Sequence, residues 1–239
     1  MNVAEPGSAD VAVLLPGTGS DDTFVRSVFE APFAAVCVRA VTPAPVPGPL
    51  LAEASFAALD EAAERHPVIA GGVSFGAHLA AEWALANPDR CAGLVLALPG
   101  WHGDPGDAPG AVSARVSADL VRSRGVEGAL AVATDGVPRW LADELTRSWR
   151  GHGDGLAGSL SAAADRQAPT LAALSRLDVP TGIATCTDDP VHPTTVAEEW
   201  LKALPRATMC TTRLDIVGTD PEALGRAAVL AWLRAGGLT

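Results

Sequence analysis

Short apolar runs alternate along the chain with longer segments in which apolar residues recur every three or four positions. The short runs are rich in Val, Ile, Leu and Ala, and they predict strands at residues 11–15, 34–40, 67–72, 93–98, 181–186 and 207–214. The amphipathic segments predict helices at residues 21–32, 50–66, 75–88, 194–205 and 220–237. Strands that alternate with helices are typical of a mostly parallel sheet covered by helices on both faces, so we expect an α/β fold of about six strands.

Residues 101–179 interrupt this alternation. They contain no strand pattern, only amphipathic helical stretches such as AVSARVSADLVRSR and PRWLADELTRSWR, separated by glycine-rich breaks that include GHGDG. An insertion of this length between two strands predicts a helical lid above the carboxyl ends of the strands, and helices that merely extend the core are the alternative. No linker divides the chain, so we expect residues 1–239 to form a single domain.

The composition narrows the class of protein and its partners. Of the 239 residues 48% are hydrophobic, and the formal net charge is −11. A chain of this charge without clustered Lys and Arg offers no surface for nucleic acid or an anionic membrane. No apolar run is long enough to span a bilayer, and the first ten residues lack a basic segment followed by an apolar one, so we expect a cytoplasmic protein. The sequence predicts no oligomeric state.

The stretch GGVSFGAH, residues 71–78, runs from a predicted strand through Gly72-x-Ser74-x-Gly76 into a predicted helix. In this setting a serine nucleophile is presented on a turn so tight that side chains at the glycine positions would collide with neighbouring backbone. A glycine-rich strand-to-helix connection without chemistry is the alternative. A second glycine-rich loop, LLPGTGSD at residues 14–21, follows the first strand and lacks the Lys of a phosphate-binding loop. Its backbone N–H groups, together with that of Phe75, suit a developing oxyanion.

At these residues the chain resembles the α/β-hydrolase superfamily, and the resemblance covers nearly the whole chain. It includes the loop after the first strand, GGVSFG, the insertion after GLVLALPG, and TCTDDPVHP after the next strand. The resemblance implies a shortened core that lacks the leading strands of the superfamily. It also implies that Ser74 is the nucleophile, that Thr18 is the second oxyanion donor, and that Asp189 is the catalytic acid because it stands four residues before a proline. Asp188 is the alternative acid.

The resemblance departs at the base, because the superfamily places its histidine after the last strand and this chain has no histidine after His192. Of its five histidines, we interpret three as a surface residue, a packed helix residue and a solvated loop residue: His66, His78 and His152. His102 follows the strand next to that of Ser74, at about 5 Å, whereas His192 follows a strand about 10 Å away but lies three residues from Asp189. A base needs both reach and an orienting carboxylate, so we predict His192, with His102 or no histidine as the alternatives.

These residues predict a serine hydrolase, an esterase or thioesterase that acts on a carboxylic ester or thioester through a Ser74 acyl-enzyme. We assign Trp101 and His102, which follow the fourth strand, to substrate binding. Tryptophans in or beside the insertion suggest a small-molecule substrate with an apolar acyl group, unless they form the core of the insertion. The histidines and acids lack the spacing of metal ligands, so we expect no metal and no cofactor. The alternative function, suggested by the missing histidine, is a non-hydrolytic protein that binds a small molecule or catalyses a lyase or cyclisation reaction.

Overall fold

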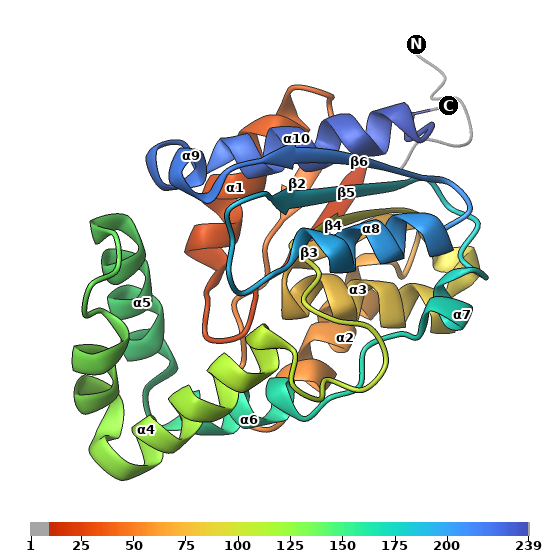
Figure 1. Ribbon diagram of the computed structural model, residues 1–239. Coiled ribbons are helices and arrows are strands. Elements are labelled where there is room, and N and C mark those ends of the chain that lie inside the picture. The colour runs from red at the N-terminus through yellow and green to blue at the C-terminus, as the bar shows by residue number, and fades with distance from the viewer. Residues whose placement is uncertain (1–9, 239) are drawn as a thin grey trace.

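The computed structural model describes residues 10–238, and within them six strands form one sheet whose neighbouring strands are all parallel. The strands are β1 (Val11–Leu15), β2 (Arg39–Val41), β3 (Val68–Val73), β4 (Cys91–Ala97), β5 (Thr181–Cys186) and β6 (Ala207–Thr212). Their order across the sheet is β2-β1-β3-β4-β5-β6, as Figure 1 shows. Strands β3 and β5 are buried along their whole length, which explains why central strands appear in the sequence as continuous apolar runs.

The predicted strand at residues 34–40 was wrong. Helix α1 (Asp22–Ala34) ends at the first residue of that range, residues 35–37 form a turn in which Cys37 has φ 60°, and β2 begins only at Arg39. Val36 and Val38 are apolar because they pack against the core from this turn, with the Val38 N–H donating to the Phe33 carbonyl oxygen at 3.1 Å. An apolar run therefore marked burial rather than a strand. The other five predicted strands agree with the structure to within two residues at each end.

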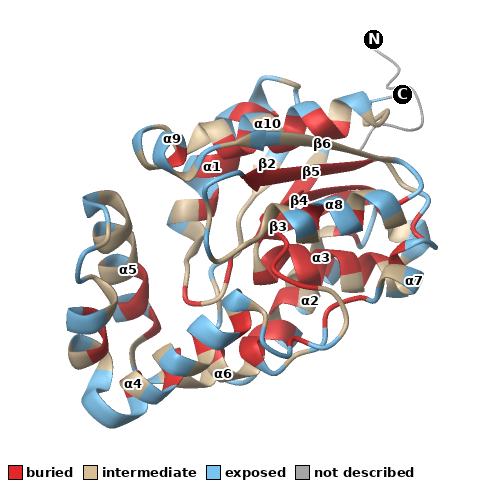
Figure 2. Ribbon diagram, in the orientation of Figure 1, coloured by how far each residue is buried: buried red, intermediate tan, exposed pale blue. Residues whose placement is uncertain are grey.

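Helices cover both faces of the sheet, as expected. One face carries α1, α9 (Leu214–Thr219) and α10 (Glu222–Arg234), and the other carries α2 (Leu51–Ala62), α3 (Phe75–Ala86) and α8 (Thr194–Ala203). Successive residues of a strand point to opposite faces, so Leu14 packs beneath α1 and α10 while Leu15 packs beneath α2 and α3. Figure 2 shows α3 as a largely buried element among helices that expose one side.

The insertion between β4 and β5 is helical, as predicted. It consists of α4 (Pro109–Ala133), α5 (Arg139–His152), α6 (Leu156–Ala164) and α7 (Leu171–Leu174), and α4 is broken at Gly125 by a non-helical backbone with φ 69° and ψ 176°. Figure 1 shows α4 and α5 standing away from the sheet on the side where the strands end. Trp149, Leu156 and Leu160 give this part a small core of its own. Two 3-10 turns, η1 (Pro88–Arg90) and η2 (Gly153–Gly155), complete the helical elements of the described residues.

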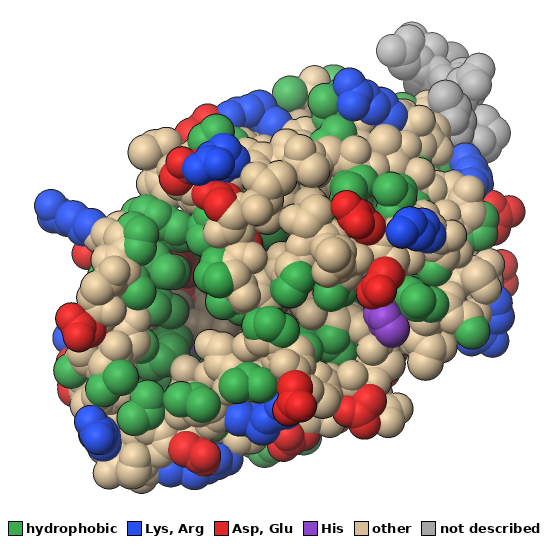
Figure 3. All heavy atoms as spheres, in the orientation of Figure 1, with side chains coloured by type: hydrophobic (Ala, Val, Ile, Leu, Met, Phe, Trp, Pro, Cys, Tyr) green, Lys and Arg blue, Asp and Glu red, His purple; other side chains and the backbone are tan. Residues whose placement is uncertain are grey.

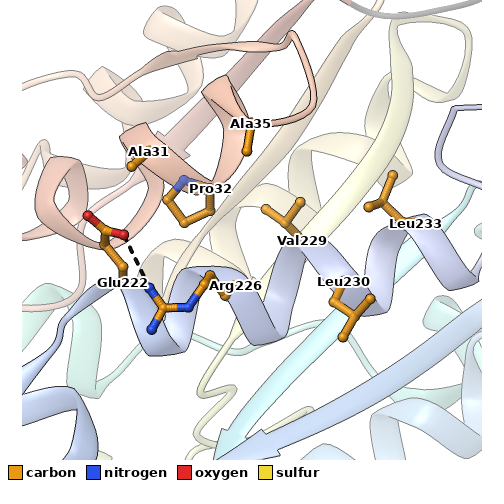
Figure 4. A pocket seen from close by; sticks show the side chains of 8 residues that line it. All are labelled: Ala31, Pro32, Ala35, Glu222, Arg226, Val229, Leu230 and Leu233. Carbon is orange, nitrogen blue, oxygen red and sulfur yellow. Dashed lines mark hydrogen bonds and ion pairs between the residues drawn. The ribbon is translucent and has the colours of Figure 1, made fainter.

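An apolar hollow of about 250 Å³ lies between α1 and α10 (Figure 4). Its only charged residues, Glu222 and Arg226, form an ion pair of 3.1 Å with each other. The complete lining is Ala31, Pro32, Ala35, Glu222, Arg226, Val229, Leu230 and Leu233. The hollow includes none of the residues predicted for catalysis and offers no unpaired charged group for chemistry.

Among residues 10–238, no helix combines the length and the apolar character needed to cross a membrane.

Helices α1 and α10 approach so closely that Gly225 is required at their crossing. A Cβ atom at Gly225 would collide with the carbonyl oxygen of Val28, which is backbone and has no rotamer to move to. We expect Gly225→Ala to lower the free energy of unfolding by about 1–3 kcal/mol, as overpacking does. Urea unfolding measures this change in the free energy of unfolding. Gly151→Ala in α5 is the matched control, because nothing lies within 4 Å of its added Cβ and Ala is the better helix former. Equal stability of the Gly225 variant and wild type would contradict the close approach.

Candidate active site

The turn from β3 to α3 holds Ser74 in a backbone conformation that L-residues rarely adopt, with φ 54° and ψ −115°. The Ser74 N–H donates to the Ala97 carbonyl oxygen at 2.8 Å, and its own carbonyl oxygen accepts from the Ala77 N–H at 2.9 Å. A Cβ at Gly72 would lie 2.8 Å from the carbonyl carbon of Gly76, and one at Gly76 would meet the Leu15 backbone at 2.7 Å. The glycines are therefore required by contact with neighbouring backbone, and the strain places the serine at the end of the sheet.

The structure brings Ser74, His192 and Asp189 into one hydrogen-bonded chain. Ser74 Oγ lies 2.8 Å from His192 Nε2, and His192 Nδ1 lies 2.8 Å from Asp189 Oδ2. An ionised carboxylate only accepts, so Nδ1 carries the proton of the neutral ring and Nε2 is left to accept the Ser74 hydroxyl proton. Histidine and carboxylate both come from the loop 187–193, between β5 and α8. This geometry can deprotonate Ser74 as it attacks an electrophile.

The Asp189 carboxylate is held ionised although its side chain is only 5% exposed. Burial raises the pKa of Asp189, but hydrogen bonding and charge from His192, with the N–H groups of Val191 and His192, outweigh it and lower the pKa below its usual value. Those two N–H groups donate to Oδ1 at 2.8 and 3.2 Å. The neighbouring Asp188 instead accepts from the Leu214 N–H at 2.6 Å. Of the two candidate acids, only Asp189 contacts the histidine.

The remaining histidines lie elsewhere. His102 Nε2 pairs with Glu199 Oε2 at 3.2 Å on the surface, and its contact is with α8 rather than with Ser74. His66 is exposed beside the amino end of β3. The interpretation of His152 as a solvated loop residue was wrong, because it ends α5, is 4% exposed, and places Nε2 2.9 Å from the Ser20 carbonyl oxygen. Its two glycine neighbours suggested solvent, but the break they form turns the chain back against the core of the insertion.

His78 lies buried directly behind the candidate base. Its Nε2 accepts from the Gly100 N–H at 3.0 Å, and its ring packs against Trp101 and Trp200 at centroid distances of 4.5 and 5.6 Å. Burial, with a smaller contribution from the charge of His192, lowers the pKa of His78 to about 3. At neutral pH an uncharged ring therefore holds the turn at Gly100, where a Cβ would lie 3.7 Å from the His192 ring. The sequence indicated that His78 is a packed helix residue, but gave no signal of this contact.

Trp101, predicted to bind substrate, is 6% exposed in the structure. Its ring packs on His78 and against Ala111 and Ala168, and its carbonyl oxygen accepts from the Trp200 indole N–H at 3.2 Å. The side chain therefore belongs to the packing that joins the sheet to the start of α4. The roles of Trp101 and His102 in substrate binding stay predictions.

The loop at residues 16–21, called the oxyanion loop below, lies directly against the serine. A Cβ at Gly17 would be 3.4 Å from Ser74 Cβ and 3.2 Å from the Val73 carbonyl oxygen. The Ser20 N–H donates to the Gly17 carbonyl oxygen at 3.1 Å and closes a turn in which Gly19 has φ 67°. Neither the Thr18 N–H nor the Phe75 N–H donates a hydrogen bond to another described residue. Two unused donors beside Ser74 suit an oxyanion.

The described residues at this edge of the sheet form no candidate metal site. Across residues 10–238, no group of three or more His, Cys, Asp and Glu side chains lies close enough together to hold a metal ion. The thiol of Cys186, at the end of β5, is also unsuited to act as a nucleophile. Burial, and then the charges of Asp189, Asp188 and Asp215, raise its pKa to about 12.

Comparison with known proteins identifies relatives. The family model described as serine aminopeptidase, S33, matches residues 52–215, which is more than half of the chain and contains Ser74, Asp189 and His192. No curated protein matches the chain in sequence. Among solved structures, the fold is similar to that of a thermophilic esterase from Thermogutta terrifontis, at 20% identity and a TM-score of 0.72, with 99% of this chain and 97% of the other covered.

Two further structures share the fold. An enol-lactonase from Burkholderia xenovorans LB400 is 18% identical with a TM-score of 0.68, and 96% of this chain and 93% of the other are covered. A structure from work on carboxylesterases of the ammonia-oxidizing thaumarchaeon Nitrososphaera gargenis is 11% identical with a TM-score of 0.69, and covers 90% of this chain and 86% of the other. At such identities the likeness concerns the fold.

The buried His78 makes stability depend on pH. Its pKa of about 3 in the fold compares with an ordinary value of about 6.5 in the unfolded chain, so the unfolded state binds more protons between these pH values. The stabilisation is complete above pH 6.5 and declines as the pH falls, by up to about 1.4 kcal/mol per pH unit. We expect His78→Gln, which keeps an acceptor for the Gly100 N–H but does not titrate, to flatten this slope in urea unfolding between pH 7 and 5. His66→Gln should keep the wild-type slope, and an equally steep slope in the His78 variant would refute the assignment.

Proposed function

We propose that this chain, which belongs to the α/β-hydrolase family described as serine aminopeptidase, S33, hydrolyses a small carboxylic ester or thioester through a covalent Ser74 acyl-enzyme. The observation that carries the proposal is the unbroken chain of contacts from Ser74 Oγ through His192 to Asp189, with 2.8 Å at each step. A serine hydroxyl by itself is a weak nucleophile, and an adjacent oriented base is what activates it. The base supplied by His192 replaces the histidine that is missing after β6.

In the acylation step, Ser74 Oγ bonds to the carbonyl carbon of the substrate while His192 Nε2 takes the hydroxyl proton. The carbonyl π electrons move to oxygen, and the N–H groups of Thr18 and Phe75 stabilise the resulting oxyanion. When the oxyanion collapses, the bond to the leaving alcohol or thiol breaks, and His192 gives that group its proton. Asp189 holds the imidazole in orientation and stabilises its charged form throughout.

In the deacylation step, a water molecule takes the place of the leaving group. His192 removes its proton as the oxygen attacks the acyl carbon, the same two N–H groups stabilise the second oxyanion, and the proton returns to Ser74 Oγ as the ester bond breaks. The products are the free acid and the original serine. Because each step transfers only one proton and needs no redox chemistry, the residues of this chain suffice without a cofactor.

The surroundings of the site support a substrate with an apolar acyl group. Figure 3 shows a hollow between the body of the molecule and the insertion, with hydrophobic side chains gathered on the side of α4 and α5. Helix α4 also exposes apolar side chains, since Val112 and Val116, four residues apart, are 40% and 54% exposed. Solved structures with this fold include proteins described as an esterase and an enol-lactonase, which also favours a small ester. No specific observation favours the non-hydrolytic alternative, because His192 contacts Ser74.

An activated serine should react with a small fluorophosphonate. We expect one covalent adduct per chain on Ser74 by intact-mass and peptide mass spectrometry, no adduct in Ser74→Ala, and labelling slowed at least about 100-fold in His192→Ala, as for loss of a general base. His102→Ala is the matched control and should label at the wild-type rate, because His102 pairs with Glu199. If folded wild-type protein forms no adduct, the proposed function is wrong.

The two neighbouring aspartates allow a sharp test of the acid. Asp189→Asn removes the acceptor that orients Nδ1–H, so we expect kcat for ester hydrolysis to fall on the order of 10²- to 10⁴-fold. Asp188→Asn should change kcat less than about threefold, since Asp188 bonds the Leu214 N–H and not the histidine. Steady-state kinetics with a p-nitrophenyl ester measures both. A larger loss in the Asp188 variant than in the Asp189 variant would reverse the assignment.

A further inference from the structure

The oxyanion loop is enclosed between the serine and the helical insertion. On its inner side, Gly17 contacts Ser74 and the Val73 carbonyl oxygen. On its outer side, a Cβ at Gly19 would lie 3.0 Å from the indole nitrogen of Trp149 and 3.6 Å from Leu160. Trp149 belongs to α5 and Leu160 to α6, so the outer wall of this loop is made by the insertion.

A buried hydrogen-bond chain joins the same loop to the insertion. His152 Nε2 lies 2.9 Å from the Ser20 carbonyl oxygen, and His152 Nδ1 lies 3.5 Å from Ser159 Oγ. Ser159 Oγ also accepts from the Gly48 N–H at 2.8 Å. A carbonyl oxygen only accepts, so Nε2 carries the ring proton, and Nδ1 accepts the Ser159 hydroxyl proton. His152 is 4% exposed and Ser159 is fully buried, so every polar atom of this neutral chain has a partner away from water.

The chain fixes the far end of the turn that contains Thr18. The Ser20 carbonyl is held by His152, and the Ser20 N–H closes the turn on Gly17, which is itself pressed against Ser74. With both ends fixed, the direction of the Thr18 N–H depends only on the few backbone torsions between them. Arg147 adds a second link through Asp21 at 2.9 and 3.0 Å, but that guanidinium is 43% exposed and therefore a weaker constraint.

We propose that His152 is a positioning residue for ester hydrolysis, which aims the Thr18 N–H at the oxyanion by holding the Ser20 carbonyl. This inference rests on the proposed function and extends it. The junction of α5 and α6, where His152 lies, thereby supports the oxyanion hole through the loop at residues 16–21. His152 contacts neither the substrate nor Ser74, so we expect it to change the energy of the transition state more than the affinity for the substrate.

The test compares His152→Leu, which fills similar volume without a donor, with His152→Gln, whose side-chain amide can donate to the Ser20 carbonyl. With p-nitrophenyl butyrate we expect kcat of His152→Leu to fall about 10- to 100-fold, less than the loss of an oxyanion donor itself, with KM changed less than about threefold. Phenylboronic acid, which forms a tetrahedral adduct with the serine, should bind more weakly by a similar factor. His152→Gln should recover most of both losses, and His66→Leu should match wild type.

The outcomes separate the two proposals. If wild type shows no Ser74-dependent ester hydrolysis, the proposed function fails and this inference fails with it. If wild type is active and folded His152→Leu has the same kcat and the same affinity for phenylboronic acid, only the inference is overturned. Should thermal unfolding reveal that both His152 variants fail to fold, Ser159→Ala decides, because it keeps the imidazole and removes the partner of Nδ1, together with the acceptor of the Gly48 N–H. A kcat reduced at unchanged KM in that variant supports the inference, and wild-type kinetics overturns it.

Discussion

The contact of β1 with the turn after β3 is the constraint on which the rest of the site depends. At Gly72 and Gly76 the backbone of this turn approaches the backbone of Leu15 and Pro16 so closely that no side chain fits between them. The approach holds Ser74 in its strained conformation and brings the oxyanion loop beside it, where the Thr18 and Phe75 N–H groups donate to no other described residue. One packing contact between two parallel strands thus sets the nucleophile and its electrostatic surroundings together.

The proposed base, His192, stands at a different position from the histidine of the α/β-hydrolase superfamily that the sequence resembles. His192 and the proposed acid, Asp189, are three residues apart in one loop, and the N–H groups of that loop help to keep the Asp189 carboxylate ionised. The His78 ring bonds the Gly100 N–H close to His192, and because burial lowers the pKa of His78 to about 3, this ring is uncharged at neutral pH. No residue after α8 bonds to Ser74, Asp189 or His192 among the described residues, although Leu214 and Arg213 hold the neighbouring Asp188.

Sequence reasoning could predict whatever is encoded in local pattern. The parallel α/β architecture, the helical insertion and five of the six strands follow from periodicity and were confirmed, and the resemblance to the α/β-hydrolase superfamily was confirmed by the family match. The pairing of His192 with Asp189 could be proposed from their spacing, although its role in catalysis stays a prediction. What the pattern does not encode is a contact between distant segments. Val36 and Val38 pack against the core from a turn, and His152 is buried where it bonds to a loop 132 residues earlier.

The loop before α8 holds both Asp189 and His192, so the proposed mechanism takes no catalytic group from the last strand and the last helix. Strand β6 is an edge strand and is only half-buried, and α10 contributes packing against α1 and β5. Under the proposed mechanism this C-terminal segment still supports the loop from outside. The Thr212 carbonyl oxygen accepts from the Thr187 N–H at 3.0 Å, and the Leu214 N–H donates to Asp188 at 2.6 Å. The edge strand therefore anchors the loop that carries Asp189 and His192 without entering the site itself.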